Sequence, residues 1–171
     1  EGADHEFASL EGVYEDVTDI ILNIKKLRIR HPGTEKLTCR IKKSGKGPVT
    51  GADVICEGDA SVINRDLHIA TLTLDRELSV ELEVSRGRGY VPAEENRGEG
   101  QPIGAIPVDS IYSPVHRVRY AVEATRVGKF TNYDRLVLEI WTDGTITPLQ
   151  ALAEAAKISR KHLNPFVLFQ P

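Results

Sequence analysis

Glycine-rich turns next to basic residues are the first feature of the chain that could do chemistry, because such turns can bind phosphate. A nucleotide-binding P-loop needs a lysine followed by serine or threonine, whose hydroxyl holds the magnesium ion. The Gly-Lys pairs at 45–46 and 128–129 are followed by Gly47 and Phe130, so both lack that hydroxyl. Gly87-Arg88-Gly89 also fails as a dinucleotide loop, since Pro92 replaces the third glycine. These glycines are more typical of tight turns.

Metal binding and acyl transfer lack their usual residue patterns as well. The five histidines are scattered, and Cys39 and Cys56 are far apart in sequence, so neither a paired CxxC nor an HExxH frame is present. No G-x-S-x-G segment holds a serine nucleophile. Acidic pairs such as Glu15-Asp16 and Glu94-Glu95 are typical of a helix start and a solvated loop. We therefore expect no catalytic residue, no metal and no cofactor on this chain.

The composition is that of a packed cytoplasmic domain. The 171 residues are 40% hydrophobic and 27% charged, enough to bury a sizeable core. A net charge of -3 argues against a free-standing nucleic-acid binder, which usually has a basic excess. No apolar run approaches the ~18 residues that cross a bilayer. Two cysteines do not make a disulfide framework and favour a reducing compartment, although one disulfide between them stays open.

Hydrophobic spacing predicts the elements that must position any site. Helical spacing runs from Gly12 to Leu27, and helix-capping residues at Thr147 and Gln150 begin a second helix at Pro148, which we expect to end before Pro165. Period-two alternation predicts strands, and the acidic stretch 93–101 is expected to be disordered. The predicted strands are Lys36–Lys42, a return near Val49–Ile55, Ser79–Ser85, and a pair at Arg117–Glu123 and Arg135–Trp141.

Several segments carry a further, combined signal. They are Val13–Val17, Ile21–Lys25, Gly47–Asp53, Arg86–Ala93, Asp109–Val115 and Thr142–Pro148. In this order they resemble the amino-terminal domain of the bacterial-type RNA polymerase alpha subunit, and the resemblance spans nearly the whole chain. The runs 86–93 and 112–115 are together its most specific part.

The resemblance implies an α+β fold. Residues 1–114 would belong mostly to an antiparallel β insert subdomain, and residues 115–171 to part of a two-layer α/β dimerisation subdomain that ends in a long helix. The chain contains no Met, and we expect the natural N-terminus to be missing. The family's opening strands and first dimer helix would precede Glu1, and its DNA-binding domain would follow Pro171.

The resemblance also implies a function and partners. The family's alpha dimer is an assembly scaffold of DNA-directed RNA polymerase, a nucleotidyltransferase: one copy binds the beta subunit and the other beta prime, and neither contributes catalytic residues. This fragment itself is expected to bind no nucleic acid and no membrane.

Site residues follow from the same resemblance. The implied partner-binding residues are Asp19, Lys25, Asp109, Ser113, Pro114, Val115 and Arg135. The implied dimer interface is the apolar face of the last helix, formed by Leu149, Leu152, Ala156, Ser159 and Leu163. The alternatives are solvated charges, a turn that packs two subdomains, and burial of the helix face within its own domain. If the scaffold hypothesis holds, Leu152 and Leu163 should face solvent in the isolated chain.

Two functions of other classes stay open at this point. A small enzyme could assemble its site from scattered residues, and would show a pocket lined by ionisable groups with displaced pKa values. A nucleic-acid-binding module could use Arg86, Arg88 and nearby basic residues, and would bind DNA with a steep salt dependence.

Overall fold

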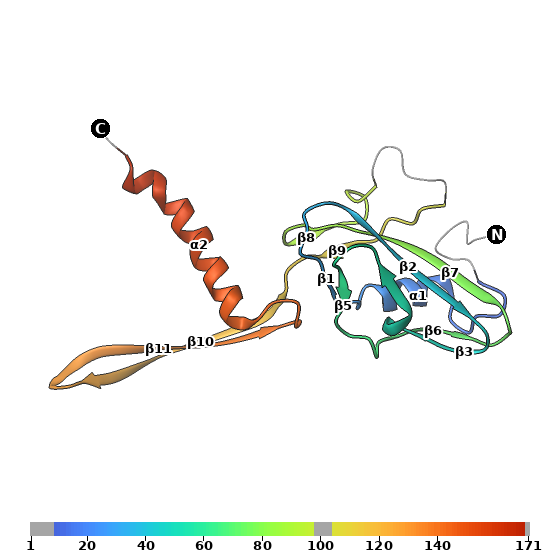
Figure 1. Ribbon diagram of the computed structural model, residues 1–171. Helices are drawn as coiled ribbons and strands as arrows, with labels where there is room; N and C mark the ends of the chain where they lie inside the picture. Colours follow the sequence, from blue (N-terminus) through green and yellow to red (C-terminus); the bar gives the residue numbers. More distant parts are fainter. Residues whose placement is uncertain (1–8, 98–103, 170–171) are drawn as a thin grey trace. The chain divides into compact units, whose positions relative to one another are not determined.

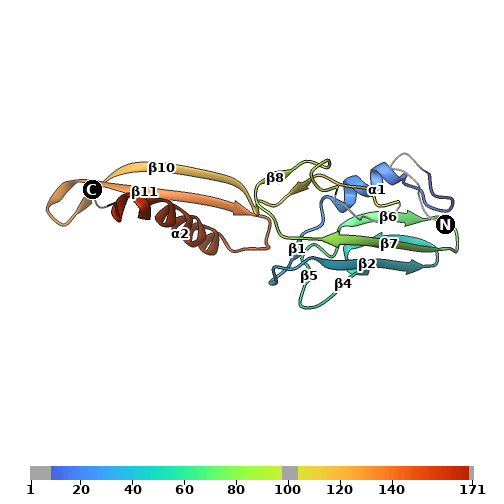
Figure 2. The same cartoon turned by 90° about the horizontal axis from the view of Figure 1, so that it is seen from above.

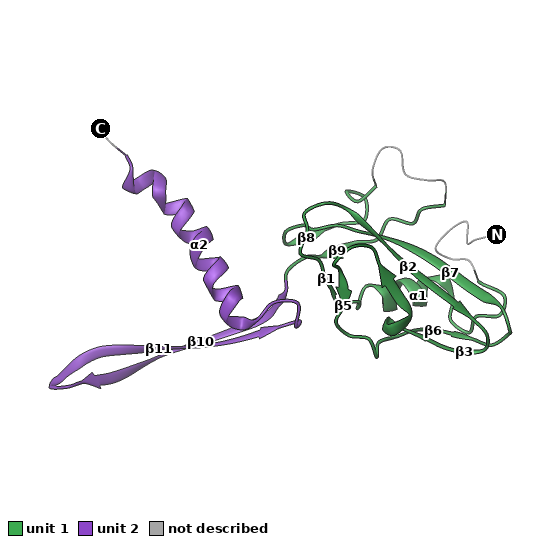
Figure 3. Cartoon of the chain, in the orientation of Figure 1, with its two compact units in different colours: residues 1–113 green, residues 114–171 purple. Residues whose placement is uncertain are grey.

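The chain is built of two units, residues 1–113 and 114–171 (Figure 3). The computed structural model describes residues 9–97 and 104–169. The elements of the first unit are α1 (Val17–Ile24), β1 (Ile29–Arg30), β2 (Leu37–Ser44), β3 (Gly47–Thr50), the 3-10 helix η1 (Gly51–Asp53), β4 (Val54–Cys56), β5 (Ser61–Val62), β6 (His68–Leu72), β7 (Glu77–Val84), β8 (Tyr90–Val91) and β9 (Ser110–Ile111) (Figure 1). The second unit contains β10 (Val115–Val127), β11 (Phe130–Thr142) and α2 (Pro148–Val167).

Antiparallel sheets form the frame of the first unit. A three-stranded sheet has the order β4-β2-β7, and three further pairs join β3 to β6, β1 to β5 and β8 to β9. The longest pairing joins β2 to β7 from Leu37 opposite Val84 to Ser44 opposite Glu77, and Figure 2 shows these strands side by side. The α+β class expected from the sequence is confirmed.

The core of the first unit lies between α1 and the inner faces of these sheets. Alternation along β2 turns Leu37, Cys39 and Ile41 inward, while Val17 and Ile20 form the buried stripe of α1. The buried apolar set is Val17, Ile20, Leu37, Cys39, Ile41, Val49, Val54, Val62, Ile69, Ala70, Leu72 and Leu78.

The first helix is shorter than its spacing predicts. It runs only from Val17 to Ile24, because the carboxylate of Asp16 accepts the amide of Asp19 at 2.8 Å and caps the N-terminus. Upstream, Tyr14 donates its amide to the carbonyl of Thr71, so strand-like pairing replaces the helix there. The prediction of a helix from residue 12 to 27 was therefore wrong at both ends.

The second unit consists of a long hairpin followed by one helix. The predicted pairing of its two strands is confirmed, and the pairing extends from Val115 opposite Thr142 to Val127 opposite Phe130. Figure 1 shows α2 diverging from the hairpin after the end of β11, and α2 buries none of its residues.

The last helix does not stop before its proline. It begins at Pro148 with the predicted capping box, but Pro165 lies inside it. Proline cannot donate to the carbonyl four residues earlier. That carbonyl belongs to Lys161 on an exposed turn, where water can satisfy it. Beyond the proline, the amide of Leu168 donates to the carbonyl of Asn164 at 2.9 Å and caps the helix. The predicted end of the helix was wrong.

The stretch expected to be disordered is only partly described. Residues 98–103 lie outside the described residues. Before them, Asn96 donates its side-chain amide to the carbonyl of Val108 at 2.7 Å and to the hydroxyl of Ser110 at 3.1 Å. The beginning of the stretch therefore has defined structure, and its side-chain bonds fasten it to the segment that leads into β9.

A carboxylate fastens the chain that enters α1 to strand β6. Glu15 accepts hydrogen bonds from the amide of Thr71 at 2.6 Å, from the Thr71 hydroxyl at 3.1 Å and from Nε2 of His68 at 2.8 Å. Burial of Glu15, whose side chain is 13% exposed, would raise its pKa. The hydrogen bonds outweigh burial and hold the pKa of Glu15 below its ordinary value.

This arrangement predicts how stability depends on pH. Because the pKa of Glu15 is lower in the folded chain than in the unfolded chain, its stabilisation is complete above about 4.3, the usual pKa of glutamate, and is lost as pH falls through the lowered value. Glu15→Gln should reduce the free energy of unfolding at neutral pH by about 1–3 kcal/mol and flatten this acid dependence. Urea denaturation at several pH values measures both effects. Glu94→Gln, at an exposed position, is the control and should retain the wild-type slope; the same slope in Glu15→Gln would contradict the prediction.

Candidate functional site

Two of the residues predicted to bind a partner, Lys25 and Asp109, form an ion pair with each other. Lys25, at the C-cap of α1, places Nζ 2.7 and 2.8 Å from the two carboxylate oxygens of Asp109, although the residues are 84 positions apart. The Lys25 ammonium holds the pKa of Asp109 below its ordinary value. Both side chains are 29% exposed, so the pair lies at the surface, where a partner could still touch it.

Asp19 is not a member of this ion pair. It is exposed in the first turn of α1, where a carboxylate interacts favourably with the helix dipole. Its position therefore fits both the predicted partner contact and the simpler alternative of a solvated helix charge.

The two segments most specific to the family resemblance pack together. A side-chain carbon added at Gly87 would lie 2.4 Å from the ring of Tyr112, so only glycine allows this approach. The Tyr112 hydroxyl lies 3.1 Å from the hydroxyl of Ser85, and the Tyr112 amide donates to the carbonyl of Gly89 at 2.8 Å. The glycines after β7 therefore make room for the ring of Tyr112, a packing site that we call the seat of Tyr112. This packing accounts for the glycines at these positions without phosphate binding.

The basic residues of this segment are partly used within the unit. The guanidinium of Arg86 donates to the carbonyl of Gly33 at 3.3 Å. This contact gives Arg86 a structural role and leaves less of the basic segment for nucleic acid.

The remaining candidates of the 109–115 segment lie where the two units are joined along the chain. Ser113 ends the first unit, and Pro114 and Val115 begin the second. The carbonyl of Pro114 accepts the amide of Asp143 at 2.9 Å, and Val115 pairs with Thr142. These contacts close the open end of the hairpin, and the predicted partner contact of this segment stays a prediction.

One face of the hairpin is charged and internally paired. Arg135 forms an ion pair with Glu123, its cross-strand neighbour. On the same face, Nε of Arg119 lies 3.5 Å from Oε2 of Glu139. The candidate Arg135 is therefore exposed but not isolated.

The other face of the hairpin is apolar and exposed, which sequence reasoning missed. Cross-strand register places three apolar pairs on it, and Tyr120 is 72% exposed. The alternation was visible in the sequence, but it does not tell whether an apolar face is covered. The apolar hairpin face consists of Val118, Tyr120, Val122, Leu136, Leu138 and Ile140.

The predicted dimer residues share one exposed stripe of α2. Leu149, Leu152 and Leu163 are 77%, 41% and 59% exposed, and Ala156 and Ser159 are exposed as well. The exposure expected of Leu152 and Leu163 is thus observed, and the described residues of the second unit do not bury this stripe. Further exposed apolar residues, not predicted, are Ile158, Phe166, Val167, Leu168 and Phe169.

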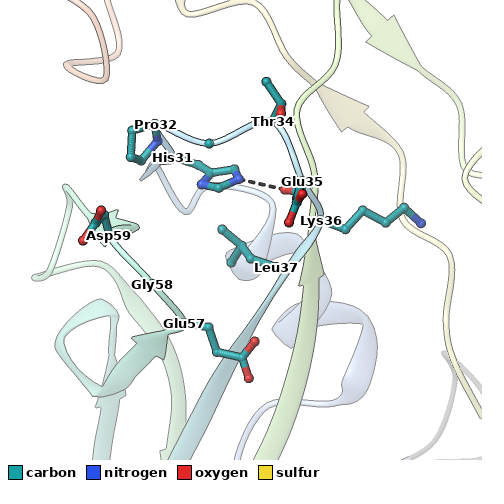
Figure 4. Close-up of a pocket in the computed structure, with 10 residues that line it drawn as sticks. His31, Pro32, Thr34, Glu35, Lys36, Leu37, Glu57, Gly58 and Asp59 are labelled. Atoms are coloured by element: carbon teal, nitrogen blue, oxygen red, sulfur yellow. Dashed lines mark hydrogen bonds between the residues drawn. The ribbon is translucent and has the colours of Figure 1, made fainter.

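A surface hollow of about 470 Å³ lies beside the turn that leads into β2 (Figure 4). His31, Glu35, Lys36, Glu57 and Asp59 contribute ionisable groups to its lining, and Nε2 of His31 lies 2.8 Å from the carbonyl of Glu35. The carboxyl groups whose pKa is lowered, Glu15, Asp53 and Asp109, lie outside this lining and in structural hydrogen bonds. The hollow therefore gives no support to the small-enzyme hypothesis.

Neither a metal-binding cluster nor a membrane-spanning helix occurs among the described residues. Across residues 9–97 and 104–169, no three His, Cys, Asp or Glu side chains gather as a metal site would require. Neither helix among the described residues combines the length and apolar character needed to cross a bilayer.

Comparison with known proteins identifies the family. Residues 1–113 match the family described as the RNA polymerase Rpb3/RpoA insert domain. The chain belongs to this family. The insert domain covers the whole first unit, including the seat of Tyr112 and the pair of Lys25 and Asp109.

Curated relatives extend the match into the second unit. The chain is 54% identical over 169 residues to the DNA-directed RNA polymerase subunit alpha of Rhodopirellula baltica, covering 99% of this chain and 51% of that protein. It is 50% identical to the subunit of the same name from Alkaliphilus oremlandii and 52% identical to that from Symbiobacterium thermophilum, with 98% of this chain and 53% of each relative covered. The chain thus spans about half the length of these relatives.

The pair of Lys25 and Asp109 predicts coupled effects on stability. Lys25→Ala and Asp109→Ala should each lower the urea midpoint slightly, and the double variant should be no less stable than the less stable single variant, because both remove one interaction. A double-mutant cycle by urea denaturation measures this coupling. Asp19→Ala combined with Lys25→Ala is the control and should be additive; additivity of the Lys25 and Asp109 changes would contradict a structural pair.

The close packing of Tyr112 on Gly87 predicts that even a methyl group at position 87 destabilises the fold. Gly87→Ala should lower the free energy of unfolding by about 1–3 kcal/mol, because its methyl group overlaps the aromatic ring. In a Tyr112→Ala background the same change should cost clearly less. Thermal denaturation of the four proteins checks this, and an equal cost in both backgrounds would show that the ring does not set the requirement for glycine.

Proposed function

We propose that this chain is part of an assembly scaffold subunit of DNA-directed RNA polymerase. The observation that carries the proposal is the uncovered apolar surface of the second unit, which lies on both the hairpin and α2. Exposed apolar surface on this scale is typical of a protein interaction site. The names of the curated relatives support the same role.

A second copy of the subunit is the proposed partner of this surface. Leu149, Leu152 and Leu163 lie along one stripe of α2, and the small residues Ala156 and Ser159 between them allow close approach of another helix. The intact dimer should bury ~2,000 Å² or more, as obligate homodimers do. The apolar hairpin face would be covered in the same assembly.

The beta and beta prime subunits are the proposed further partners. Asp19 and the pair of Lys25 and Asp109 would offer charged contacts on the first unit, Arg135 on the second, and Ser113, Pro114 and Val115 between them along the chain. The subunit would act in the cytoplasm within a nucleotidyltransferase without contributing a catalytic residue or holding a cofactor on this part of the chain.

Charged substitutions on the stripe of α2 test the dimer. Leu152→Glu and Leu163→Glu should each weaken self-association at least roughly tenfold, because a charge buried in an apolar interface must be desolvated. Gel filtration with light scattering, over a range of concentrations of the full-length subunit that contains this chain, measures the association.

Lys161→Glu is the matched control, because residue 161 lies opposite the stripe on the same helix. It should associate as the wild type does. Equal self-association of all four proteins would exclude the stripe as the interface. Adding the purified beta and beta prime subunits, each in turn, then tests the scaffold role: a dimer that co-elutes with either one supports it, and a dimer that binds neither contradicts it.

A further inference from the structure

The two cysteines of the chain meet across neighbouring strands. Cys39 on β2 and Cys56 on β4 are direct partners in the sheet register and form a disulfide, with Cα atoms 4.0 Å apart. The neighbouring pair, Thr38 and Glu57, is joined by a backbone hydrogen bond, since Glu57 donates its amide to the carbonyl of Thr38 at 3.1 Å. The cysteines therefore occupy a pair without hydrogen bonds, where opposed side chains come closest. The sequence had left this disulfide open.

The two sulfur-bearing residues differ in burial. Cys39 is fully buried within the core, beside Leu37 and Ile41 on the inner face of β2. Cys56 is the last residue of β4 and is only partly buried. Thiol exchange requires a thiolate to reach one of the two sulfurs. Access from solvent therefore favours attack on Cys56 over attack on Cys39.

The strand that carries Cys56 is weakly held compared with its neighbours. β4 contains three residues at the edge of its sheet, whereas β2 pairs with β7 over eight positions. Reduction would leave Cys39 as a small apolar side chain in the core. The core should then persist while the hold on β4 loosens.

We propose that Cys56 is a thiol-exchange site, at which low-molecular-weight thiols and disulfides of the glutathione class open and close the bond to Cys39. Cys39 is the buried resolving thiol. The structural change is confined to β4 and the turn that follows it. The disulfide between Cys39 and Cys56 therefore responds to the ratio of thiols to disulfides in its surroundings while the rest of the first unit stays folded.

The exchange proceeds in two balanced steps. In reduction, a thiolate attacks Sγ of Cys56, a mixed disulfide forms there, and Cys39 leaves as a thiolate that takes a proton from water. A second thiolate attacks the small-molecule sulfur of the mixed disulfide and releases Cys56 as a thiolate and the small molecule as its disulfide. Two thiols thus give two electrons to the protein disulfide, and oxidation follows the reverse path.

Burial of Cys39 also sets which step is slow. An apolar core disfavours the thiolate, so the step that forms or uses the Cys39 thiolate should limit the rate in both directions. During oxidation, the mixed disulfide on Cys56 should consequently accumulate before the bond to Cys39 closes.

Trapping the intermediate tests the proposal on the wild-type 171-residue chain. The reduced chain is mixed with glutathione disulfide, quenched with acid at successive times, alkylated and mapped by peptide mass spectrometry. The glutathione adduct should appear on Cys56 roughly tenfold or more faster than on Cys39 and then decay as the internal disulfide forms. An adduct that forms equally on both cysteines, or first on Cys39, would overturn the assignment.

Variants and hydrogen exchange provide independent readouts. Cys39→Ala should retain the adduct on Cys56, whereas Cys56→Ala should resist modification until urea unfolds it. Should Cys39→Ala fail to fold, the wild-type time course alone decides. In the wild type, reduction should speed amide exchange at residues 54–58 and leave α1 and β7 unchanged. Exchange that rises throughout the first unit, or nowhere, would refute the local effect.

Discussion

A two-stranded hairpin and a single helix cannot bury the apolar residues that they carry, and this constraint governs the second unit. Among residues 9–97 and 104–169, strands β10 and β11 pair only with each other, and α2 buries no residue. An isolated hairpin is marginally stable in water, and a helix gains most of its stability by packing an apolar face. The second unit therefore gains stability when its apolar faces are covered.

The first unit, in contrast, buries its core of apolar residues by itself. Its core is enclosed by α1 and several short sheets. Contacts between residues that are far apart in sequence join the edge of the unit to this core. Lys25 binds Asp109, Tyr112 rests on Gly87, and Asn96 bonds Val108. All three contacts hold the last stretch of the unit against earlier elements of the same unit.

Local signals made much of this fold predictable, and long-range pairing limited the rest. The hairpin and the start of α2 follow from alternation and from the capping residues Thr147 and Gln150, which act over a few positions. The N-terminal helix was overestimated because pairing of residue 14 with β6 outweighs helical spacing. Continuation of α2 through Pro165 depends on solvent around the freed carbonyl, which spacing does not encode.

In the candidate site, too, local patterns could be predicted from the sequence and long-range contacts could not. Exposure of the stripe on α2 could be anticipated, because the resemblance predicted its residues and small side chains accompany the leucines. No sequence pattern joins Lys25 to Asp109, since 84 residues separate them and either charge alone is typical of a solvated surface. The ring of Tyr112 against Gly87 could not be derived either, although the two segments that it joins were the most informative ones.

The two faces of the hairpin decide which of them a second copy can cover. On one face, Arg117 lies 3.8 Å above the ring of Trp141 and Arg135 pairs with Glu123, so burial would desolvate charges that are already satisfied. On the other, exposed Val122 and Leu136 gain free energy from removal from water. Covering the apolar face leaves Arg135 on the opposite side of the same sheet. The proposed dimer contact and the proposed contact with a large subunit thus use different faces and can form together.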